Sequence, residues 1–377
     1  MIITKLYVRN FRNIREAELT PDKELNIFVG KNAQGKTNLM EAVSVCLGGS
    51  FRHVRFSQYL PKNNPEAEVF IRLCFTDDNY TERENIIEYT ISNNKVNITY
   101  NGMKMNDAAE LYGVLKYVVF IPEHLNLIKG APELRRAYLD DVAVMQTKTH
   151  LKKLSRYNRG LKQRNNILTY CKPGTTAAEL SAQLAGWNNV LAAEGINVTY
   201  GRLKYFAFLK EYAAEIYSKL TNEAEQLEME YFSSIFKTES ISFENIDNLY
   251  NQYIAELENN LETELKLRYT CAGIHRDDVN FFINGMPARD FASQGQLRSA
   301  ALALKLSEAE IIRRKNRTCP VVILDDILSE LDHVRRDFVI NNIDNSQVFI
   351  TCCNIDDLSS LKNGKTWLTE NGCFTEV

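Results

Sequence analysis

The sequence lacks any long uninterrupted apolar run, although 45% of its 377 residues are hydrophobic. No run approaches the roughly 18 apolar residues that a membrane-spanning helix needs, which excludes a membrane protein. The stretch from Met1 to Lys5 continues directly into a strand-like pattern, so we expect no signal peptide and a cytoplasmic protein. Internal repeats and low-complexity segments are also missing.

Paired cysteines are missing as well. The eight cysteines never occur as C-x-x-C, and most lie in apolar stretches, which disfavours a zinc site and indicates reduced, buried thiols. The adjacent residues Cys352 and Cys353 stand at the end of a predicted strand. We interpret both as core residues rather than as a redox pair.

The sequence does contain one strong motif, G-x-x-x-x-G-K-[ST], the loop whose backbone N–H groups surround nucleotide phosphates. The residues expected to contact the nucleotide are Gly30, Lys31, Asn32, Ala33, Gln34, Gly35, Lys36 and Thr37. An apolar strand precedes the loop and a helical pattern follows it, so the phosphates would lie at a helix N-terminus, which favours anions. Lys36 would reach the β- and γ-phosphates, and the Thr37 hydroxyl would bind Mg²⁺. A chance match is the alternative, and the flanking strand and helix disfavour it.

A predicted pair of strands before this loop turns at Arg12 and Asn13. This pair could place both side chains close to the nucleotide. A solvated turn arginine is an equally good interpretation from the spacing alone.

A second candidate element is the continuous apolar run over 321–324, which is typical of a strand buried on both faces and which ends in Asp325 and Asp326. Asp325 could hold Mg²⁺, directly or through water. Asp326 could accept a proton from the attacking water. An ordinary pair of acids between a strand and a loop is the less favoured alternative.

A third element is the loop around Ser293, Gly295 and Gln296. Ser293 followed three residues later by Gln296 matches a capping box, so the loop should open a helix and offer a second phosphate-binding end. By itself this pattern predicts only a helix cap.

Charge is distributed unevenly although the net charge is only −3, which argues against a uniformly basic surface and requires a local patch for any nucleic-acid contact. Helical periodicity dominates residues 132–267, and residues 142–178 contain basic but no acidic side chains. The basic side chains expected on one helical face are Lys148, Lys152, Arg156, Arg159 and Lys162. A loop cluster adds Arg52 and Arg55 as candidate DNA-binding residues. A solvated face is the usual explanation, and we weigh DNA or an acidic partner about evenly against it.

Together, residues 30–37, 291–296, 321–326 and 329–332 resemble, in order and spacing, the ABC-type ATPases of the SMC-like branch, with Ser293–Gln296 as signature loop and Ser329–Asp332 as D-loop. The stretches 6–13, 122–136 and 275–278 look closer still to the RecF family of bacterial recombination mediators. The resemblance implies an α/β fold, an ABC-type ATPase head with mixed β-sheets and an inserted, mainly helical lobe. The head would comprise residues 1–131 and 268–377, and the insertion residues 132–267.

The resemblance also implies ATP and Mg²⁺ as cofactors and an ATP-dependent homodimer. Each nucleotide would be held by the phosphate loop of one subunit and by Ser293, Gly295 and Gln296 of the other. Such proteins bind duplex and gapped DNA, and single strands near junctions, and they work with RecO and RecR to help RecA load. Asp326 stands where transporters carry Glu, so we expect a slow, DNA-stimulated ATPase. The histidine that contacts the γ-phosphate in transporters is missing, and Thr351 is the candidate for its place.

An alternative is an ABC-type ATPase that regulates a protein or nuclease partner, with DNA peripheral. The basic face distinguishes the two, because contacts to phosphates would make binding strongly salt-dependent. A small-molecule kinase gives no account of the signature-like loop. The strand pair before the phosphate loop and the mid-chain insertion disfavour a transporter ATPase.

Overall fold

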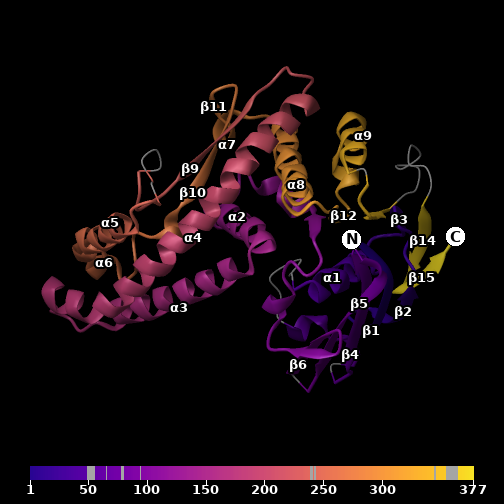
Figure 1. Cartoon of the computed structure of the whole chain (residues 1–377), viewed down its shortest axis with the longest axis horizontal. Helices are drawn as coiled ribbons and strands as arrows, with labels where there is room; N and C mark the ends of the chain where they lie inside the picture. Colours follow the sequence, from indigo (N-terminus) through magenta and orange to yellow (C-terminus); the bar gives the residue numbers. More distant parts are fainter. Residues whose placement is uncertain are drawn as a thin grey trace. The chain divides into compact units, whose positions relative to one another are not determined.

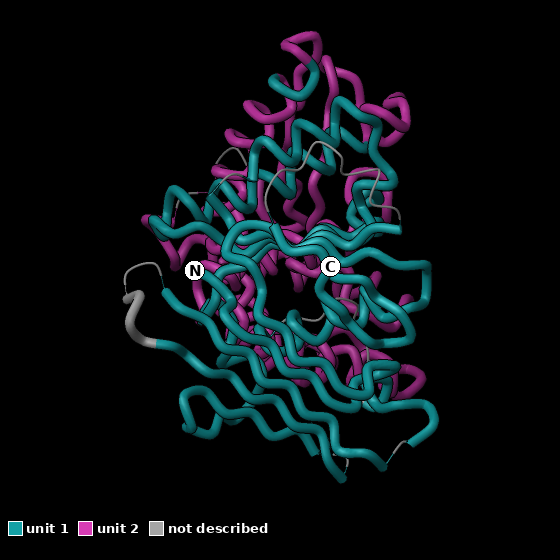
Figure 2. The backbone as a smooth tube through the Cα atoms, turned by 90° about the vertical axis from the view of Figure 1, so that its right-hand side faces the viewer, with its two compact units in different colours: residues 1–126, 219–221, 298–377 teal, residues 127–218, 222–297 magenta. Residues whose placement is uncertain are grey.

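The computed structural model describes residues 1–48, 56–64, 66–77, 80–93, 95–237, 241, 243–343, 345–353 and 364–377. These residues form two compact units (Figure 2). The first comprises Met1–Asn126, Lys219–Thr221 and Arg298–Val377, and the second Leu127–Ser218 and Asn222–Leu297. Residues 268–297 therefore group with the helices. The predicted inserted lobe, residues 132–267, does not include this segment. The predicted division into an ATPase head and an inserted lobe stays a prediction.

A six-stranded mixed sheet carries the phosphate loop in the first unit (Figure 1). Its strands, in spatial order, are β15 (Cys373–Glu376), β14 (Lys365–Glu370), β3 (Leu25–Val29), β13 (Val348–Cys352), β12 (Val321–Asp325) and β8 (Tyr117–Phe120). All pairs except β14 with β15 are parallel. Every residue of β12 and β13 is buried, which explains their continuous apolar sequence.

A second sheet of the first unit is antiparallel. Its strands, in spatial order, are β2 (Ile14–Leu19), β1 (Ile2–Phe11), β4 (Val69–Asp77), β5 (Tyr80–Ser92), β6 (Lys95–Tyr100) and β7 (Met103–Met105). Asn101 and Gly102 join β6 to β7 with φ of 49° and 77°. Two successive positive φ values define the type I′ turn that the Asn-Gly pair predicts.

Helices complete the first unit. They are α1 (Lys36–Cys46), α8 (Gln294–Asn316, whose first residues belong to the second unit), α9 (His333–Asn342) and the short η1 (Phe56–Tyr59), η2 (Ala108–Leu111), η3 (Pro122–Asn126) and η6 (Leu328–Glu330). Helix α1 is buried on nearly every side, since nine of its residues, from Lys36 to Cys46, are buried.

The second unit is mainly helical, as the periodicity over 132–267 predicts. Its helices are α2 (Pro132–Gln146), α3 (Lys148–Tyr170), α4 (Ala177–Leu220), α5 (Ile246–Asn259), α6 (Leu261–Leu267), α7 (Ala288–Phe291) and the short η5 (Ile274–Arg276). A three-stranded sheet accompanies them, with β11 (Met286–Pro287), β10 (Asp278–Ile283) and β9 (Leu227–Phe232) in that order. Tyr157 of α3, Leu191 of α4 and Tyr253 of α5 share one core cluster. Among the described residues, no helix is both long and apolar enough to cross a membrane.

Candidate nucleotide site

The phosphate loop joins strand β3 to helix α1, as the motif predicts. Two of its residues have left-handed backbones, Ala33 with φ of 65° and Gly35 with φ of 118°. A φ of 118° strains any residue with a Cβ atom, so glycine suits the position of Gly35; a Cβ atom there would also lie 2.9 Å from Oδ1 of Asn13. The loop therefore turns sharply and presents successive backbone N–H groups at the start of α1, a geometry that favours anions.

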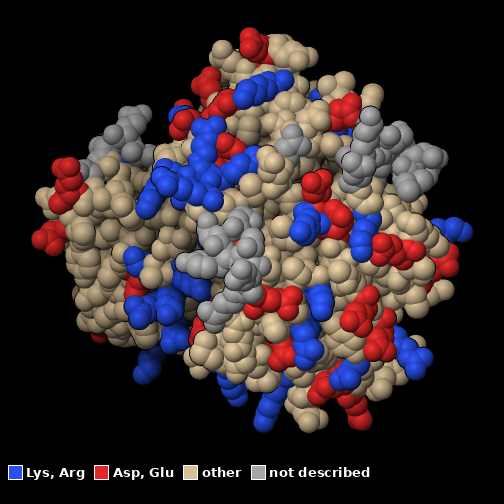
Figure 3. Space-filling model, turned by 45° about the vertical axis from the view of Figure 1, so that its right-hand side comes forward, with Lys and Arg blue, Asp and Glu red and all other residues tan. Residues whose placement is uncertain are grey.

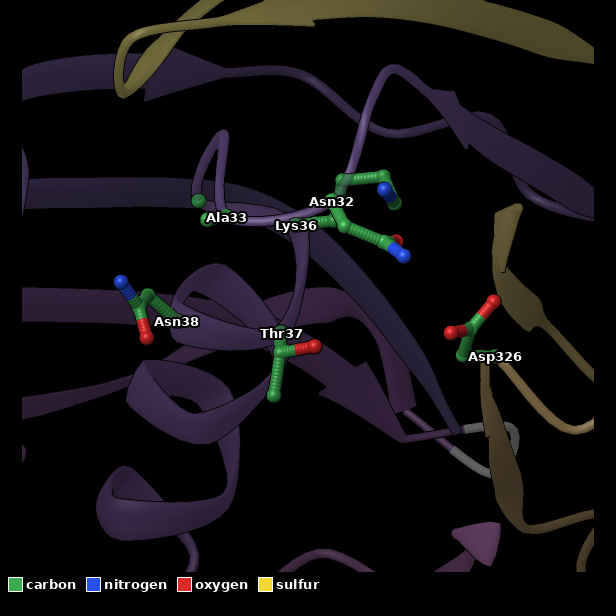
Figure 4. Close-up of a pocket in the computed structure, with 7 residues that line it drawn as sticks. Asn32, Ala33, Lys36, Thr37, Asn38 and Asp326 are labelled. Atoms are coloured by element: carbon green, nitrogen blue, oxygen red, sulfur yellow. The ribbon is translucent and has the colours of Figure 1, made fainter. Parts of the chain in front are cut away.

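The side chain of Lys36 is buried to 6% exposure. Its ammonium donates hydrogen bonds to the carbonyl oxygens of Gly30, at 2.5 Å, and Lys31, at 3.0 Å. The same stretch of the chain forms a pocket, shown in Figure 4. The pocket is lined by Asn32, Ala33, Gly35, Lys36, Thr37, Asn38 and Asp326. The loop thus holds the positively charged Lys36 ammonium beside the space that the phosphates of a nucleotide would occupy.

The turn between β14 and β15 supports the phosphate loop from the far end of the sequence. The N–H groups of Asn371 and Gly372 donate to Oε1 and to the main-chain oxygen of Gln34, both at 2.7 Å. A Cβ atom on Gly30 would lie 2.3 Å from the carbonyl oxygen of Thr369. The Asn371-Gly372 pair is a hairpin signal, but its contact with the loop depends on the pairing of β14 with β3, which no local pattern reveals.

The turn between β1 and β2 lies against helix α1. Oδ1 of Asn13 accepts a hydrogen bond from the amide of Asn38 at 2.7 Å. Nε of Arg12 lies 2.6 Å from a carboxylate oxygen of Glu41, whose side chain is buried. Arg12 is therefore held by an ion pair to α1 and is not an ordinary solvated turn arginine. Contact of Arg12 and Asn13 with nucleotide stays a prediction.

The predicted Mg²⁺ ligands meet at the carboxyl end of β12. The hydroxyl of Thr37 donates to Oδ1 of Asp325 at 3.0 Å, and Asp325 is 2% exposed. A carboxylate beside a hydroxyl is a donor set that suits Mg²⁺, which takes its remaining ligands from phosphates and water. These two residues therefore fit the ion. No group of three or more His, Cys, Asp or Glu side chains that could hold a metal occurs within the described part of the chain.

Asp326 has an unusual backbone, with φ of 54°. Its N–H group donates to Oγ1 of Thr351 at 2.9 Å, and its carbonyl accepts from the hydroxyl of Ser329 at 2.8 Å. Among the described atoms, Oδ1 of Asp326 is buried without a hydrogen-bond partner. In Figure 4 the hydroxyl of Thr37 and the amide of Asn32 point toward the side where Asp326 lies. A buried acceptor that lacks a donor and lines the pocket suits a group that receives a proton from a ligand.

Thr351 does not face the pocket in the way that the missing histidine would require. Its side chain is 1% exposed and donates to Oδ1 of Asp325 at 2.8 Å. The hydroxyl is therefore committed to the two aspartates rather than to solvent.

The loop around Ser293 forms the predicted capping box. The N–H group of Ser293 donates to the Gln296 side chain at 2.8 Å, and the N–H group of Gln296 donates to the Ser293 hydroxyl at 3.2 Å. The Gln296 amide also donates to Glu225 at 2.8 Å. This loop belongs to the second unit, whereas all residues lining the pocket belong to the first. The contact of Ser293, Gly295 and Gln296 with nucleotide stays a prediction.

The basic residues predicted on one face of helix α3 are exposed together. They are Lys148, Lys152, Arg156, Arg159 and Lys162. The opposite face packs into the unit through Tyr157 and Leu168. One basic residue of this stretch, Arg164, is fully buried and lies 2.7 Å from Glu264. Arg52 and Arg55 lie outside the described residues.

In the stretch 275–278 of the second unit, Asp277 is buried, His275 and Asp278 are half-buried and Arg276 is exposed. Nε2 of His275 lies 3.1 Å from the carbonyl oxygen of Thr270, which can only accept, so the neutral ring accepts from the Tyr157 hydroxyl at Nδ1, 2.8 Å away. Burial lowers the pKa of His275 to about 4. Burial raises the pKa of Asp277, although the nearby Arg202 opposes this shift. His275 and Asp277 are therefore bonded within this unit.

The prediction of buried thiols is correct for Cys46, Cys74 and Cys352 and wrong for Cys353 and Cys373, which are exposed; Cys171, Cys271 and Cys319 are partly exposed. Cys352 is buried, but Cys353 is exposed. The Cys353 thiol donates to Oδ1 of Asn32 at 3.0 Å and lies 4.0 Å from Nζ of Lys36. The two neighbours differ because Cys352 ends strand β13 inside the sheet, whereas Cys353 is the first residue beyond it and reaches the phosphate loop.

We expect bound nucleotide to protect Cys353 from alkylation because the thiol adjoins the Lys36 ammonium. With ATP and Mg²⁺ at about ten times the Kd, the rate of labelling by N-ethylmaleimide should fall about tenfold if only the empty site reacts. Peptide mass spectrometry measures this rate. Cys373, which is also exposed, serves as the internal control and should label at an unchanged rate. Equal labelling of Cys353 with and without ATP would contradict the position of the nucleotide.

The phosphate loop between β3 and α1, the aspartates at the end of β12 and the mixed sheet that carries both define the head of an ABC-type ATPase. The family model described as the RecF/RecN/SMC N terminal domain matches residues 2–372. The chain belongs to this family and, within it, to the RecF proteins.

Individual relatives agree over the full length. The chain is 33% identical to the "DNA replication and repair protein RecF" of Clostridioides difficile, over 99% of this chain and 100% of that protein. It is 31% identical to the protein of the same name from Bacillus thuringiensis, over 99% and 98%. A solved structure of "the recombination mediator protein RecF-ATPrS in RecFOR pathway" superimposes with a TM-score of 0.90 and 31% identity, covering 100% of this chain and 98% of that one.

More distant structures share only the fold. An Smc head bound to the C-winged helix domain of ScpA gives a TM-score of 0.56 at 16% identity and covers 100% of this chain and 97% of that one. The predicted fold class, an ABC-type ATPase head with a helical insertion, is confirmed, and so is the resemblance to RecF.

Proposed function

We propose that this protein is a recombination mediator that binds ATP with Mg²⁺, hydrolyses it slowly and uses its nucleotide state to control dimerisation and DNA binding. The observation that carries the proposal is the meeting of three groups around one pocket: the Lys36 ammonium, the Thr37–Asp325 pair and the Asp326 carboxylate. A similar structure described as "RecF-ATP" supports ATP as the nucleotide; it is 30% identical, with a TM-score of 0.88 over 100% of this chain and 97% of that one.

The chemistry follows from the placement of these groups. The N–H groups of the loop and the Lys36 ammonium would bind the phosphates, and Thr37 with Asp325 would hold Mg²⁺. That ion would neutralise charge on the phosphate oxygens when bound. Asp326 would orient the attacking water and take its proton. Asp has one methylene fewer than the Glu of transporters, so its carboxylate reaches less far and slow turnover is expected.

Dimerisation would complete the site. All residues that line the pocket come from the first unit. The Ser293 loop of the same chain is not among them. That loop ends in a capped helix, a feature that suits phosphate. We propose that Ser293, Gly295 and Gln296 of one subunit bind the nucleotide held by the phosphate loop of another, so that ATP joins two copies and hydrolysis releases them.

DNA would bind along helix α3. Lys148 and Lys162 mark the ends of its exposed basic face, which is about 21 Å long at 1.5 Å per residue. A row of this length can follow several phosphates of one duplex strand. Side chains of both signs occur on the face drawn in Figure 3, and the net charge of the chain is −3. The basic face is therefore a local patch and not part of a general positive coat.

Reversing two charges on this patch should abolish tight duplex binding. We expect Lys152→Glu combined with Arg156→Glu to weaken duplex affinity on the order of 100-fold at low salt, and to make the slope of log K against log salt less negative by roughly 2. Fluorescence anisotropy with a labelled gapped duplex measures both quantities. ATP affinity should remain unchanged, because no residue of α3 lines the pocket.

The matched control reverses two exposed lysines outside α3, Lys104→Glu with Lys210→Glu. This double variant carries the same net charge as the first and should bind DNA nearly as wild type does. Equal losses in both variants would mean that net charge, not the α3 face, governs binding. Unchanged DNA affinity in the α3 variant would instead favour the alternative function, an ATPase that regulates a protein or nuclease partner.

Sedimentation of the wild-type protein with and without ATP and a gapped duplex tests the proposed function as a whole. We expect a monomer without ATP, a dimer with ATP, and a larger complex when DNA is added. A sedimentation coefficient that ATP does not change would refute the switch. The recombination partners RecO and RecR, and RecA through them, are the proposed context in which this complex acts. The similar recombination mediator, which is described as part of the RecFOR pathway, supports RecO and RecR.

A further inference from the structure

Thr351 stands where two neighbouring strands end together. In the parallel pair of β12 and β13, Asp325 is in register with Thr351. The Thr351 side chain is buried. Its hydroxyl forms two hydrogen bonds, one to each of the consecutive aspartates of the site.

The single hydroxyl of Thr351 makes two bonds of opposite sense. It donates its proton to Oδ1 of Asp325 at 2.8 Å and accepts the N–H group of Asp326 at 2.9 Å. Oδ1 of Asp325 also accepts from Thr37 at 3.0 Å. Through its hydroxyl oxygen, Thr351 therefore fixes both the carboxylate of Asp325, which would hold Mg²⁺, and the backbone of Asp326, which would act as the base.

The backbone of Asp326 needs such support. Its φ of 54° lies in the left-handed region, which is uncommon for residues other than glycine and is strained. The hydrogen bond from its N–H group to Thr351 holds one side of the residue, and the bond from Ser329 to its carbonyl holds the other. Between these two bonds, the side chain lines the pocket with a buried oxygen that lacks a partner among the described atoms.

We propose that Thr351 is a positioning residue for ATP hydrolysis: its hydroxyl aligns Asp325 and Asp326 relative to each other and does not contact the γ-phosphate. The inference rests on the proposed ATPase function. A positioning role predicts a change in turnover rate without a matching change in ATP affinity, whereas a general structural role would change both. Thr351 bonds to the two aspartates, whereas the proposed phosphate contact is made by the Lys36 ammonium. Removal of the Thr351 hydroxyl should therefore slow ATP turnover far more than it weakens ATP binding.

Replacement by valine tests the hydroxyl with little change in volume. We expect Thr351→Val to lower kcat by about 10- to 100-fold, whereas the Kd for ATP, measured with a fluorescent analogue and Mg²⁺, should change less than about threefold. Thr351→Ser, which retains the hydroxyl, should keep kcat within about threefold of wild type. Thermal unfolding verifies that each variant is folded, and Thr351→Ala removes the same hydroxyl if the valine variant does not fold.

The matched control is Thr199→Val in helix α4. Thr199 is also fully buried, but its hydroxyl has no hydrogen-bond partner among the described atoms, so the same substitution should leave kcat unchanged. Wild-type turnover in Thr351→Val would overturn the positioning role. An equal loss in Thr351→Ser would assign the effect to packing, and a parallel loss of ATP affinity would assign Thr351 to nucleotide binding; both results contradict the proposal. If the wild-type protein itself hydrolysed no ATP with Mg²⁺ and DNA, the proposed ATPase function would fail and this inference with it.

Discussion

Replacing Lys36 with methionine is expected to abolish ATP-dependent dimerisation. The ammonium is buried and donates hydrogen bonds to two carbonyl oxygens of its own loop, at 2.5 and 3.0 Å, and it also lies 4.0 Å from the Cys353 thiol. Methionine has a similar length but no charge, and it removes at least one charge-assisted hydrogen bond to phosphate. Such a bond contributes about 1.5–3 kcal/mol, which predicts an ATP affinity lower on the order of 10- to 100-fold. At ATP concentrations that saturate the wild type, the variant should stay monomeric in light scattering.

The control for this experiment is Lys62→Met, since Lys62 is an exposed lysine of the same unit that takes no part in the pocket. It should dimerise with ATP as the wild type does. Normal ATP-dependent dimers of Lys36→Met would refute the assignment of the phosphate loop as the site where nucleotide joins two copies.

Replacing Asp326 with asparagine is expected to separate ATP binding from hydrolysis. Asparagine tolerates positive φ better than most residues, so the backbone at 54° and its bonds to Thr351 and Ser329 should survive. The amide cannot accept a proton from water as a carboxylate does. Loss of a general base costs about 10²- to 10⁴-fold in rate. The variant should therefore bind ATP, remain dimeric for long periods and release little phosphate.

A phosphate-release assay and light scattering on the same sample measure both effects. Asp247→Asn, at an exposed position in the first turn of α5, makes the same chemical change away from the pocket and should hydrolyse ATP normally. Brisk turnover by Asp326→Asn would remove Asp326 from the role of base. Monomeric behaviour with ATP would show instead that its carboxylate contributes to binding.

Much of the site was predictable because it depends on short segments. The strand, loop and helix around Lys36, the buried strand ending in Asp325, and the capping box at Ser293 each need fewer than about 20 neighbouring residues, whose patterns follow from local geometry. The Asn-Gly turns within the described residues are of the same kind. Asn101, Asn284 and Asn371 all have φ near 50°, as a two-residue hairpin requires.

The errors and omissions concern contacts between distant segments. Cys353 was predicted to lie in the core because it follows Cys352 at the end of an apolar strand. In the structure it lies one position beyond β13, and its thiol contacts Asn32. Arg164 lies in the basic stretch 142–178 but outside the predicted exposed face, and it is fully buried against Glu264. In both cases the partner is about 100 or more residues away, so no periodicity could indicate it.

By itself the sequence determined the elements and the residue types at their ends: a cradle for phosphate, two carboxylates after a buried strand, and an amphipathic helix with one basic face. Only the tertiary structure decided which ends meet. The order β14, β3, β13, β12 brings Gln34 to the last hairpin and Asp325 to Thr351, because the ends of paired parallel strands lie at one edge of a sheet. The register of non-local strand pairs is set by packing summed over the whole unit, and a single segment carries too little of that energy to reveal it.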